Sequence, residues 1–471
     1  MKSYYLVFFI LIISSCSLDN KTGIWKDASD IPLESKASKT IEPLTNNKKI
    51  VRYEDVFVKN KKFNKQVKRK DNSILKIDVP SNTDKWLEQY GSKTNNISNF
   101  SYSGYKSKIS KSRKLSKPVS NRNIIFYDNN LITYDHKGRI FIYSLSQRKK
   151  VFIYDFYKKN FKNYKKKIYL TVNKKILYAA DNLGYIYAID LNSKSLIWAK
   201  NYGISFRSNI KVVNEEIFVA NQDNVIYSIN KKNGKKNWQY ATSITFLKSD
   251  FENTFVIDKI NKNLMFLNTS GQLYSINYSA NKINWVLNFK SPSLVESSTD
   301  LFLSQPIVIK NNNLIVTTNN SVHSYNYLTA SRNWTFSSDS ILKPILTINH
   351  TYIFSKNNFL ICLDNNTGDV LWARNIYRAK QLRNLEQELF LISGGGGDKI
   401  KNKMGKIRDF KIANNDIYLF FKNGYLITFD YSNGNLKDIK RISKNGISTR
   451  VVFLKTNMFL IDNDNKLLKF N

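Results

Sequence analysis

Short apolar runs alternate with polar turns along the chain from about residue 130 to its end. The runs are rich in β-branched and aromatic residues, and apolar and polar positions alternate within many of them, as in YIYAI at 185–189. Asn, Asp and Gly stand between the runs, where tight hairpin turns need a positive φ angle. The pattern predicts many short antiparallel strands joined by hairpins.

The pattern of strand, turn, strand, turn and Trp recurs along the chain. Successive units are mostly 40 to 50 residues apart, which leaves room for about four strands in each, and this is typical of β-propeller blades. The last unit ends after about two strands, so we expect a segment within residues 95–128 to close the ring. The sequence predicts an all-β, eight-bladed propeller of four-stranded antiparallel blades. The units begin at Leu131, Ile176, Ile217, Leu264, Leu314, Tyr352, Ile417 and Met458.

Tryptophan stands at the same place in five consecutive units. A cofactor could stack on such rings, but a binding site is usually singular, whereas a packing solution repeats. We therefore predict that each indole packs between neighbouring sheets. Gly234, Gly368 and Gly434 stand in the second turn of their units, where a positive φ is expected. The five residues are Trp198, Trp238, Trp285, Trp334 and Trp372.

The N-terminus has the layout of a secretory signal peptide. Lys2 precedes an apolar stretch that is too short to span a bilayer, and small residues then lead to Cys16. This order predicts a lipoprotein signal peptide at 1–15 and lipidation of Cys16, while an ordinary signal peptide with an incidental cysteine is the alternative. Residues 16–80 are rich in Lys, Asn, Ser and Asp, which predicts a flexible tether.

The chain is strongly basic, with 74 Lys and Arg against 36 Asp and Glu in 471 residues and a formal net charge of +38. Such a charge could attract nucleic acid or anionic lipid. The lysines are spread along the whole chain, however, and no known nucleic-acid module accompanies them. A basic solvated surface is the favoured interpretation, and no nucleic-acid partner is predicted.

Two stretches show the repeat best: VIYSINKKNGKKNW at 225–238 and LICLDNNTGDVLW at 360–372. They resemble the propeller repeat of pyrroloquinoline quinone (PQQ) enzymes. With the lipoprotein signal and eight units, residues 86–471 resemble the BamB family, the propeller lipoproteins of the outer-membrane β-barrel assembly machinery. WLEQYGSKTNNISNF at 86–100 is similar to the W-P-Q-x-G-G-N stretch that precedes the blades in that family.

The resemblance implies a non-catalytic scaffold, lipid-anchored on the periplasmic face of a bacterial outer membrane and monomeric within its complex. Its partner would be a POTRA domain of the barrel-inserting subunit. A contact loop of that family follows the second blade's Trp and reads apolar-x-apolar-Arg. By resemblance, Ile204, Phe206 and Arg207 would dock on the partner.

The family also places acidic residues on a neighbouring loop. Asp250 and Glu252 stand there in this chain, with a spacing that departs from the family's pair. An ordinary connection between blades remains the alternative interpretation of the whole contact loop.

Two other classes of function compete with the scaffold. PQQ dehydrogenases contain a similar repeat, but they typically use a vicinal cysteine pair and a Ca²⁺ site. This chain lacks such a pair, because Cys16 and Cys362 are far apart in the sequence. The three histidines lack metal-ligand spacing, so no enzyme activity, cofactor or metal is predicted. A periplasmic or surface propeller that binds an unrelated protein is the third possibility. The Gly-rich stretch at 393–406 lacks a phosphate-loop ending and is expected to be a flexible insertion within 375–415.

Overall fold

The computed structural model describes residues 16–18, 25–27, 62–69, 75–119, 123–157, 161, 163–244, 250–289, 301–378 and 398–471. The predicted signal peptide, most of the predicted tether and residues 379–397 of the predicted insertion lie outside this part. The chain divides into two units, Met1–Lys59 and Asn60–Asn471. In the first unit, β1 (Cys16–Leu18) pairs with β2 (Trp25–Asp27) in antiparallel orientation.

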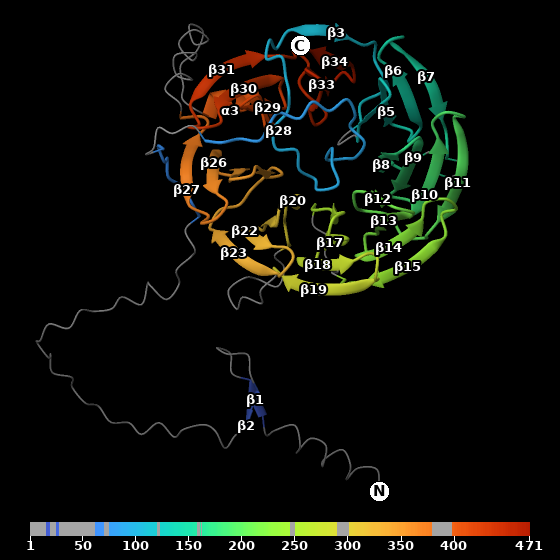
Figure 1. Ribbon diagram of the computed structural model, residues 1–471, viewed down its shortest axis with the longest axis horizontal. Coiled ribbons are helices and arrows are strands. Elements are labelled where there is room, and N and C mark those ends of the chain that lie inside the picture. Colours follow the sequence, from blue (N-terminus) through green and yellow to red (C-terminus); the bar gives the residue numbers. More distant parts are fainter. Residues whose placement is uncertain are drawn as a thin grey trace, which may run out of the picture. The chain divides into compact units, whose positions relative to one another are not determined.

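The second unit is a ring of eight four-stranded antiparallel sheets around a central axis, as the sequence predicts (Figure 1). Blades 1 to 4 follow one another in the chain, each with its first strand nearest the axis. Their strands are β4 (Ile125–Tyr127), β5 (Asn130–Tyr134), β6 (Ile140–Ser144) and β7 (Lys149–Tyr154); β8 (Ile168–Asn173), β9 (Ile176–Asp181), β10 (Tyr185–Asp190) and β11 (Ser195–Asn201); β12 (Lys211–Val213), β13 (Glu216–Ala220), β14 (Val225–Asn230) and β15 (Lys236–Ala241); β16 (Thr254–Asp258), β17 (Asn263–Leu267), β18 (Gln272–Asn277) and β19 (Lys282–Asn288).

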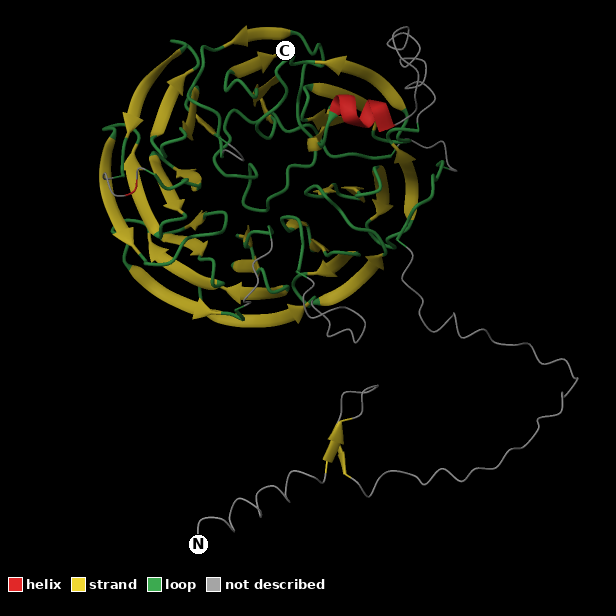
Figure 2. Ribbon diagram, turned by 180° about the vertical axis from the view of Figure 1, so that it is seen from behind, coloured by secondary structure: helices red, strands yellow, loops and turns green. Residues whose placement is uncertain are grey.

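Blades 5 to 8 complete the ring. One short helix, α3 (Asp398–Met404), precedes blade 7 and is the helix drawn in red in Figure 2. The strands are β20 (Val308–Lys310), β21 (Asn313–Thr317), β22 (Val322–Asn326) and β23 (Ser331–Phe336); β24 (Ile345–Leu346), β25 (His350–Phe354), β26 (Phe359–Asp364) and β27 (Val370–Asn375); β28 (Ile407–Ala413), β29 (Asp416–Phe421), β30 (Tyr425–Asp430) and β31 (Leu436–Arg441); β32 (Val452–Leu454), β33 (Asn457–Ile461) and β34 (Leu467–Phe470).

Blade 8 takes its outermost strand from the segment of the chain that precedes blade 1. β3 (Lys108–Lys111) pairs with β34, which gives the sheet order β3-β34-β33-β32. Ser107 and Asn471 extend this pairing by exchanging backbone hydrogen bonds of 3.1 and 2.9 Å. The predicted closure of the ring by a segment within residues 95–128 is confirmed, and it removes the exposed strand edges that an open ring would have.

The repeated Trp lies on the outermost strand of its blade, opposite the third strand. The side chain that pairs with it is always small, namely Ala188, Ser228, Ser275, Ser324 and Cys362 in blades 2 to 6. A β-bulge follows each of these pairs, which twists the outer strand. In blades 1 and 7, larger or polar pairs, Ile142 with Phe152 and Thr428 with Asp438, take the same place.

Four of the five repeated indoles donate a hydrogen bond to a backbone carbonyl of the next blade. Trp198 of blade 2 donates its Nε1 hydrogen to the carbonyl of Lys231 in blade 3 at 3.0 Å. Gly234, in the same turn of blade 3, has φ of +67°, and a Cβ atom there would lie 2.4 Å from the Trp198 ring. Gly368 and Gly434 meet Trp334 and Trp372 in the same way. Glycine is therefore required both for the turn and for the close approach of the ring.

The apolar core is distributed between adjacent blades. One cluster joins Tyr178 and Trp198 of blade 2 to Ile217 and Tyr227 of blade 3, and comparable clusters fill the spaces further around the ring. α3 adds Ile400 and Met404 to the core of blades 6 and 7. No helix among the described residues is long and apolar enough to cross a membrane.

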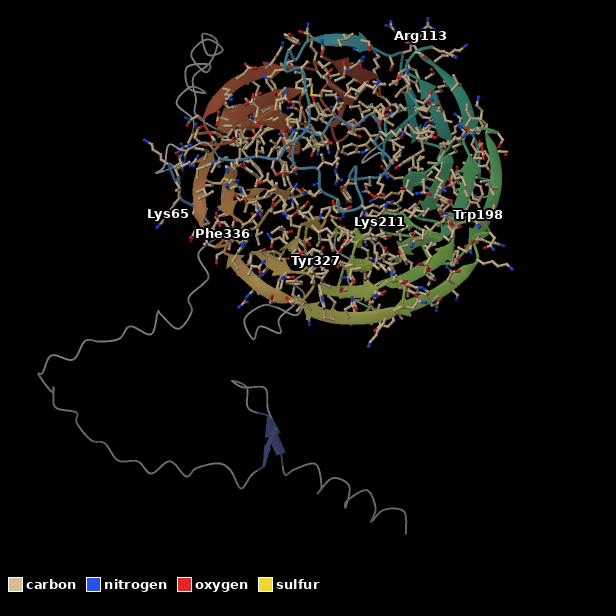
Figure 3. The ribbon with its side chains drawn as sticks, viewed as in Figure 1. Lys65, Arg113, Trp198, Lys211, Tyr327 and Phe336 are labelled. Carbon is tan, nitrogen blue, oxygen red and sulfur yellow. The ribbon has the colours of Figure 1, made fainter. Side chains whose placement is uncertain are left out.

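Part of the segment predicted to be a flexible tether instead packs on the propeller. Val67 exchanges backbone hydrogen bonds of 3.0 Å with Ala373 on the outer strand of blade 6. The Phe63 ring lies 5.2 Å from Phe336 and 6.1 Å from Phe359. Residues 62–69 therefore form an extended addition to the outer wall, near the labels Lys65 and Phe336 in Figure 3.

Candidate functional site

The two faces of the ring are distinguished by the order of the strands. In a blade of four antiparallel strands, the hairpin between the second and third strands lies on the same face as the connection to the next blade. Residues 202–210 and 250–253 are such connections. The turns between first and second strands, and between third and fourth, lie on the opposite face. We call the face that carries the connections between blades the mouth face.

The segment 83–100 crosses the axis and joins the blades to one another. It forms hydrogen bonds with the innermost strand of seven blades and with the turn after β32 in blade 8. Figures 1 and 2 show the segment running through the middle of the ring. The blade residues are Phe126, Val172, Lys211, Ile257, Ile309, Leu346 and Ile412 of blades 1 to 7 and Lys455 of blade 8.

A buried ion pair fixes the middle of this segment. Lys211 Nζ lies 2.7 Å from Glu88 Oε2 and also donates to the Ser92 carbonyl and to Asn95 Oδ1, each at 2.8 Å. Lys93 forms a second ion pair with Glu88. Burial alone would raise the pKa of Glu88, but Lys211 and Lys93 outweigh it and hold that pKa below its ordinary value. Burial lowers the pKa of Lys211 to about 8.

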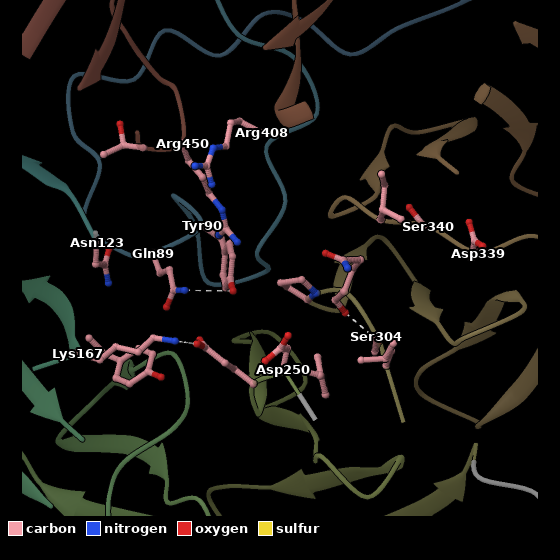
Figure 4. A pocket seen from close by; sticks show the side chains of 18 of the residues that line it. Gln89, Tyr90, Asn123, Lys167, Asp250, Ser304, Asp339, Ser340, Arg408 and Arg450 are labelled. Atoms are coloured by element: carbon pink, nitrogen blue, oxygen red, sulfur yellow. Dashed lines mark hydrogen bonds and ion pairs between the residues drawn. The ribbon is translucent and has the colours of Figure 1, made fainter. Parts of the chain in front are cut away.

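A cavity of about 660 Å³ opens above the segment on the mouth face. Trp86, Gln89 and Tyr90 of the axial segment line it together with residues from the inner ends of several blades (Figure 4). Its charged lining is mixed. The charged residues are Lys62, Lys167, Lys356, Arg408, Arg450, Asp250, Glu252 and Asp339.

The structure separates the three residues predicted to dock on a partner. Ile204 is exposed at the surface, and Arg207 is half-buried beside the loop that follows blade 3. Phe206, by contrast, is only 1% exposed and packs edge-on against Tyr202 and Tyr227 at 5.7 and 6.0 Å. The Phe206 ring therefore belongs to the core between blades 2 and 3, and it offers no surface to a partner.

The two acidic residues do lie on the loop beside this connection. Ser208 forms a parallel β-bridge with Asn253, which places the backbones of Arg207 and Glu252 side by side. Asp250 is exposed, and Glu252 is half-buried in an ion pair with Lys167 (Figure 4). The structure thus brings together the predicted charged residues of both loops.

Lys167 is the residue of this cluster that the sequence pattern did not single out. Its ammonium also lies over the Tyr169 ring, 5.6 Å from the centroid. Burial, and then the nearby charges of Arg207 and Arg450, lower the pKa of Lys167 to about 8, against the opposing effect of Asp250. The only sequence signal was its place at the end of the Lys-rich stretch 158–167.

Cys362, the cysteine whose side chain the structure describes, is fully buried in β26. Burial raises the pKa of its thiol well above the ordinary value. Among the described residues, no three His, Cys, Asp or Glu side chains are grouped so that they could hold a metal ion.

Comparison with known proteins agrees with this architecture. Residues 158–374 match the family model described as outer membrane protein assembly factor BamB. No curated protein matches the sequence. The fold is similar to the crystal structure of BamB from Moraxella catarrhalis, with a TM-score of 0.59 and 11% identity over 78% of this chain and 99% of that chain.

Quinone-dependent enzymes share the fold. A quinohemoprotein alcohol dehydrogenase from Pseudomonas putida HK5 has a TM-score of 0.55 and 9% identity over 82% of this chain and 80% of that chain. A europium-containing methanol dehydrogenase has a TM-score of 0.56 and 9% identity, with 80% and 89% covered. At these identities the structural likenesses show the fold. Together with the family match over residues 158–374, they support a BamB-like propeller of PQQ-type repeats.

Proposed function

We propose that this BamB-like propeller is a non-catalytic scaffold of the outer-membrane β-barrel assembly machinery, held at the periplasmic face by a lipid on Cys16. Its partner is a POTRA domain of the barrel-inserting subunit. The observation that carries the proposal is the match of residues 158–374 to the BamB family model, because this range includes both loops of the charged cluster.

The geometry of the cluster supports a docking surface. Ile204 supplies an exposed apolar contact, and Arg207 supplies a guanidinium for a carboxylate on the partner. Glu252 and Lys167 form their ion pair beside it and supply both signs of charge. The connection between blades 2 and 3 is held by the buried Phe206 ring, so the docking residues stand on a rigid base.

Co-purification from detergent-solubilised membranes tests the proposal. We expect Arg207→Glu and Ile204→Asp each to release the barrel-inserting subunit while the circular dichroism of the propeller is retained. Ile260→Asp is the matched control, because Ile260 is 90% exposed in the turn between β16 and β17, on the face opposite the mouth. Undiminished co-purification of both loop variants would remove this surface from the proposal.

A PQQ-dependent dehydrogenase is the second candidate, because quinone enzymes share the fold at similar TM-scores. Adding PQQ and Ca²⁺ to the purified chain, with a dye-linked alcohol-oxidation assay, tests this candidate. Turnover that requires the quinone would replace the scaffold proposal by an enzymatic one.

A further inference from the structure

A second, inner cavity of about 210 Å³ lies beside the axial segment 83–100, and its lining has an excess of positive charge. Its lining includes four basic residues, Lys343, Arg408, Lys411 and Arg450, and one acidic residue, Asp409. The four residues come from the connection before blade 6, the start of blade 7 and the connection before blade 8. Three blades thus direct cations at one small space.

The single carboxylate is already engaged. Asp409 Oδ1 accepts hydrogen bonds from Lys411 Nζ at 2.8 Å and from the Phe410 amide at 3.0 Å. Its Oδ2 accepts the Val451 amide at 3.1 Å. Lys411 and Asp409 are both buried, and their opposite charges neutralise each other. Lys343, Arg408 and Arg450 are left with no carboxylate of the lining to neutralise them.

The three remaining cations have few hydrogen-bond acceptors among the described residues, although Lys343 and Arg408 are half-buried. Arg408 Nε is buried and has no hydrogen-bond partner among the described residues. Lys343 Nζ donates at 3.3 Å to the carbonyl of Pro344. The Arg450 guanidinium lies over the Tyr90 ring, 4.7 Å from its centroid. Arg450 is exposed to solvent and lines the cavity.

Such an arrangement is costly without a counter-ion. Like charges gathered at one small, partly enclosed cavity repel one another, and such a cavity attracts counter-ions. Burial, and next the charge of Lys411, lower the pKa of Lys343 well below its ordinary value, because Asp409 only partly offsets them. A bound anion would neutralise the charge and supply the missing acceptor to Arg408.

We propose that the inner cavity binds a small oxyanion, with phosphate or carboxylate groups, between Lys343, Arg408 and Arg450. The volume is below the 300–1,000 Å³ of pockets for drug-sized ligands, and it suits an inorganic ion with a few waters. Planar guanidinium groups bind such oxygens through paired hydrogen bonds. The mouth cavity supplies the entry path, since Gln89, Tyr90, Arg408 and Arg450 line both cavities (Figure 4).

Calorimetric titration of the purified full chain with inorganic phosphate tests the proposal. Citrate is titrated in parallel, and sodium chloride at matched ionic strength controls for screening. We expect saturable binding of phosphate, citrate or both, and none of chloride. Saturation by phosphate alone assigns the site to phosphate compounds, and saturation by citrate alone assigns it to carboxylates.

Charge-removing variants locate the site. Lys343→Met and Arg408→Met should each weaken binding at least tenfold. Lys343→Met should also raise the thermal midpoint of the anion-free protein, because it removes one of the like charges that line the inner cavity. Lys356→Met is the matched control, since this exposed lysine lines only the outer cavity, and it should change neither quantity.

Two results would overturn the proposal. One is the absence of saturable binding for both phosphate and citrate. The other is wild-type affinity in Arg408→Met, or in Lys343→Met where that variant folds. Arg408→Met keeps the test decisive even if Lys343→Met does not fold. The buried Arg408 Nε has no hydrogen-bond partner among the described residues, so the substitution breaks no hydrogen bond of this atom.

Discussion

Lys211, in the first strand of blade 3, is joined to Glu88, in the segment that crosses the axis, by an ion pair of 2.7 Å. The Lys211 side chain is fully buried, and that of Glu88 is 5% exposed. The two residues are 123 positions apart, so the pair fixes the axial segment to the ring across a long stretch of chain. Figure 3 places Lys211 toward the middle of the ring and Trp198 near its rim.

We predict that Glu88→Gln lowers the free energy of unfolding by about 3–5 kcal/mol, because it leaves the Lys211 ammonium buried without its carboxylate. Urea unfolding at pH 7 measures the loss. Glu215→Gln is the matched control. Glu215 lies at the same 2.7 Å from Lys231 but is 54% exposed, so its loss should cost much less than the loss of Glu88.

The double variant Glu88→Leu/Lys211→Met separates charge from packing. Replacing a whole buried pair by apolar residues is often close to neutral, so the double variant should recover most of the stability that Glu88→Gln loses. Equal losses for Glu88→Gln and Glu215→Gln would show that the buried pair has no special part in holding the axial segment.

The blades could be predicted from sequence because their causes are local. Alternating apolar residues, hairpin turns and the Trp with its small partner all lie within one unit, so the period is visible in the chain. The role of residues 83–100 could not be predicted. Its hydrogen-bond partners are spread over all eight blades, so no local pattern marks them.

The sequence also could not predict which loop residues are buried. Phe206 and Ile204 are both apolar residues of one connection, yet the first packs in the core and the second is exposed. Their difference depends on Tyr202 and Tyr227, which come from two blades. In the same way, Phe63 and Val67 occur in a polar, Lys-rich stretch, and only their contacts with blades 5 and 6 show that they are ordered.

The two loop residues should therefore respond differently to truncation. Phe206→Ala should cost about 3–5 kcal/mol of stability through a cavity between blades 2 and 3. Ile204→Ala should change stability by less than about 0.5 kcal/mol, because Ile204 is exposed. Thermal unfolding of both variants makes the comparison. A Phe206→Ala protein as stable as the wild type would place this ring outside the core.

Gly234 is predicted to be intolerant of any side chain, since a Cβ atom would meet the Trp198 ring at 2.4 Å. Gly203→Ala provides the control for backbone strain alone, because Gly203 has φ of +81° and a Cβ atom added there would meet nothing within 4 Å. We expect Gly203→Ala to cost about 1 kcal/mol and Gly234→Ala clearly more. Equal costs would mean that the ring moves aside freely.

The repeated tryptophans should differ in how much their N–H group contributes to the free energy of unfolding. Trp334 donates to the Asn365 carbonyl at 2.8 Å, whereas the buried Nε1 of Trp238 has no partner among the described residues. Replacement by Phe removes the donor in both. Trp334→Phe should therefore cost about 1 kcal/mol more than Trp238→Phe, measured by urea unfolding. The reverse order would contradict the role assigned to the hydrogen bond between blades.

Stability should rise between pH 8 and about 10 and fall above this range. Burial lowers the pKa of Lys211 to about 8 in the folded protein, so unfolding takes up a proton in this window, and stability increases by up to about 1.4 kcal/mol per pH unit for one proton. Burial raises the pKa of Tyr102 and Tyr178 to about 12, so their contribution is lost above pH 10, where unfolded tyrosine ionises. Urea unfolding at constant ionic strength from pH 7.5 to 11 measures the curve, and Lys211→Met should reduce its rising slope. A wild-type protein whose stability falls steadily from pH 7.5 would show that Lys211 keeps an ordinary pKa in the folded state.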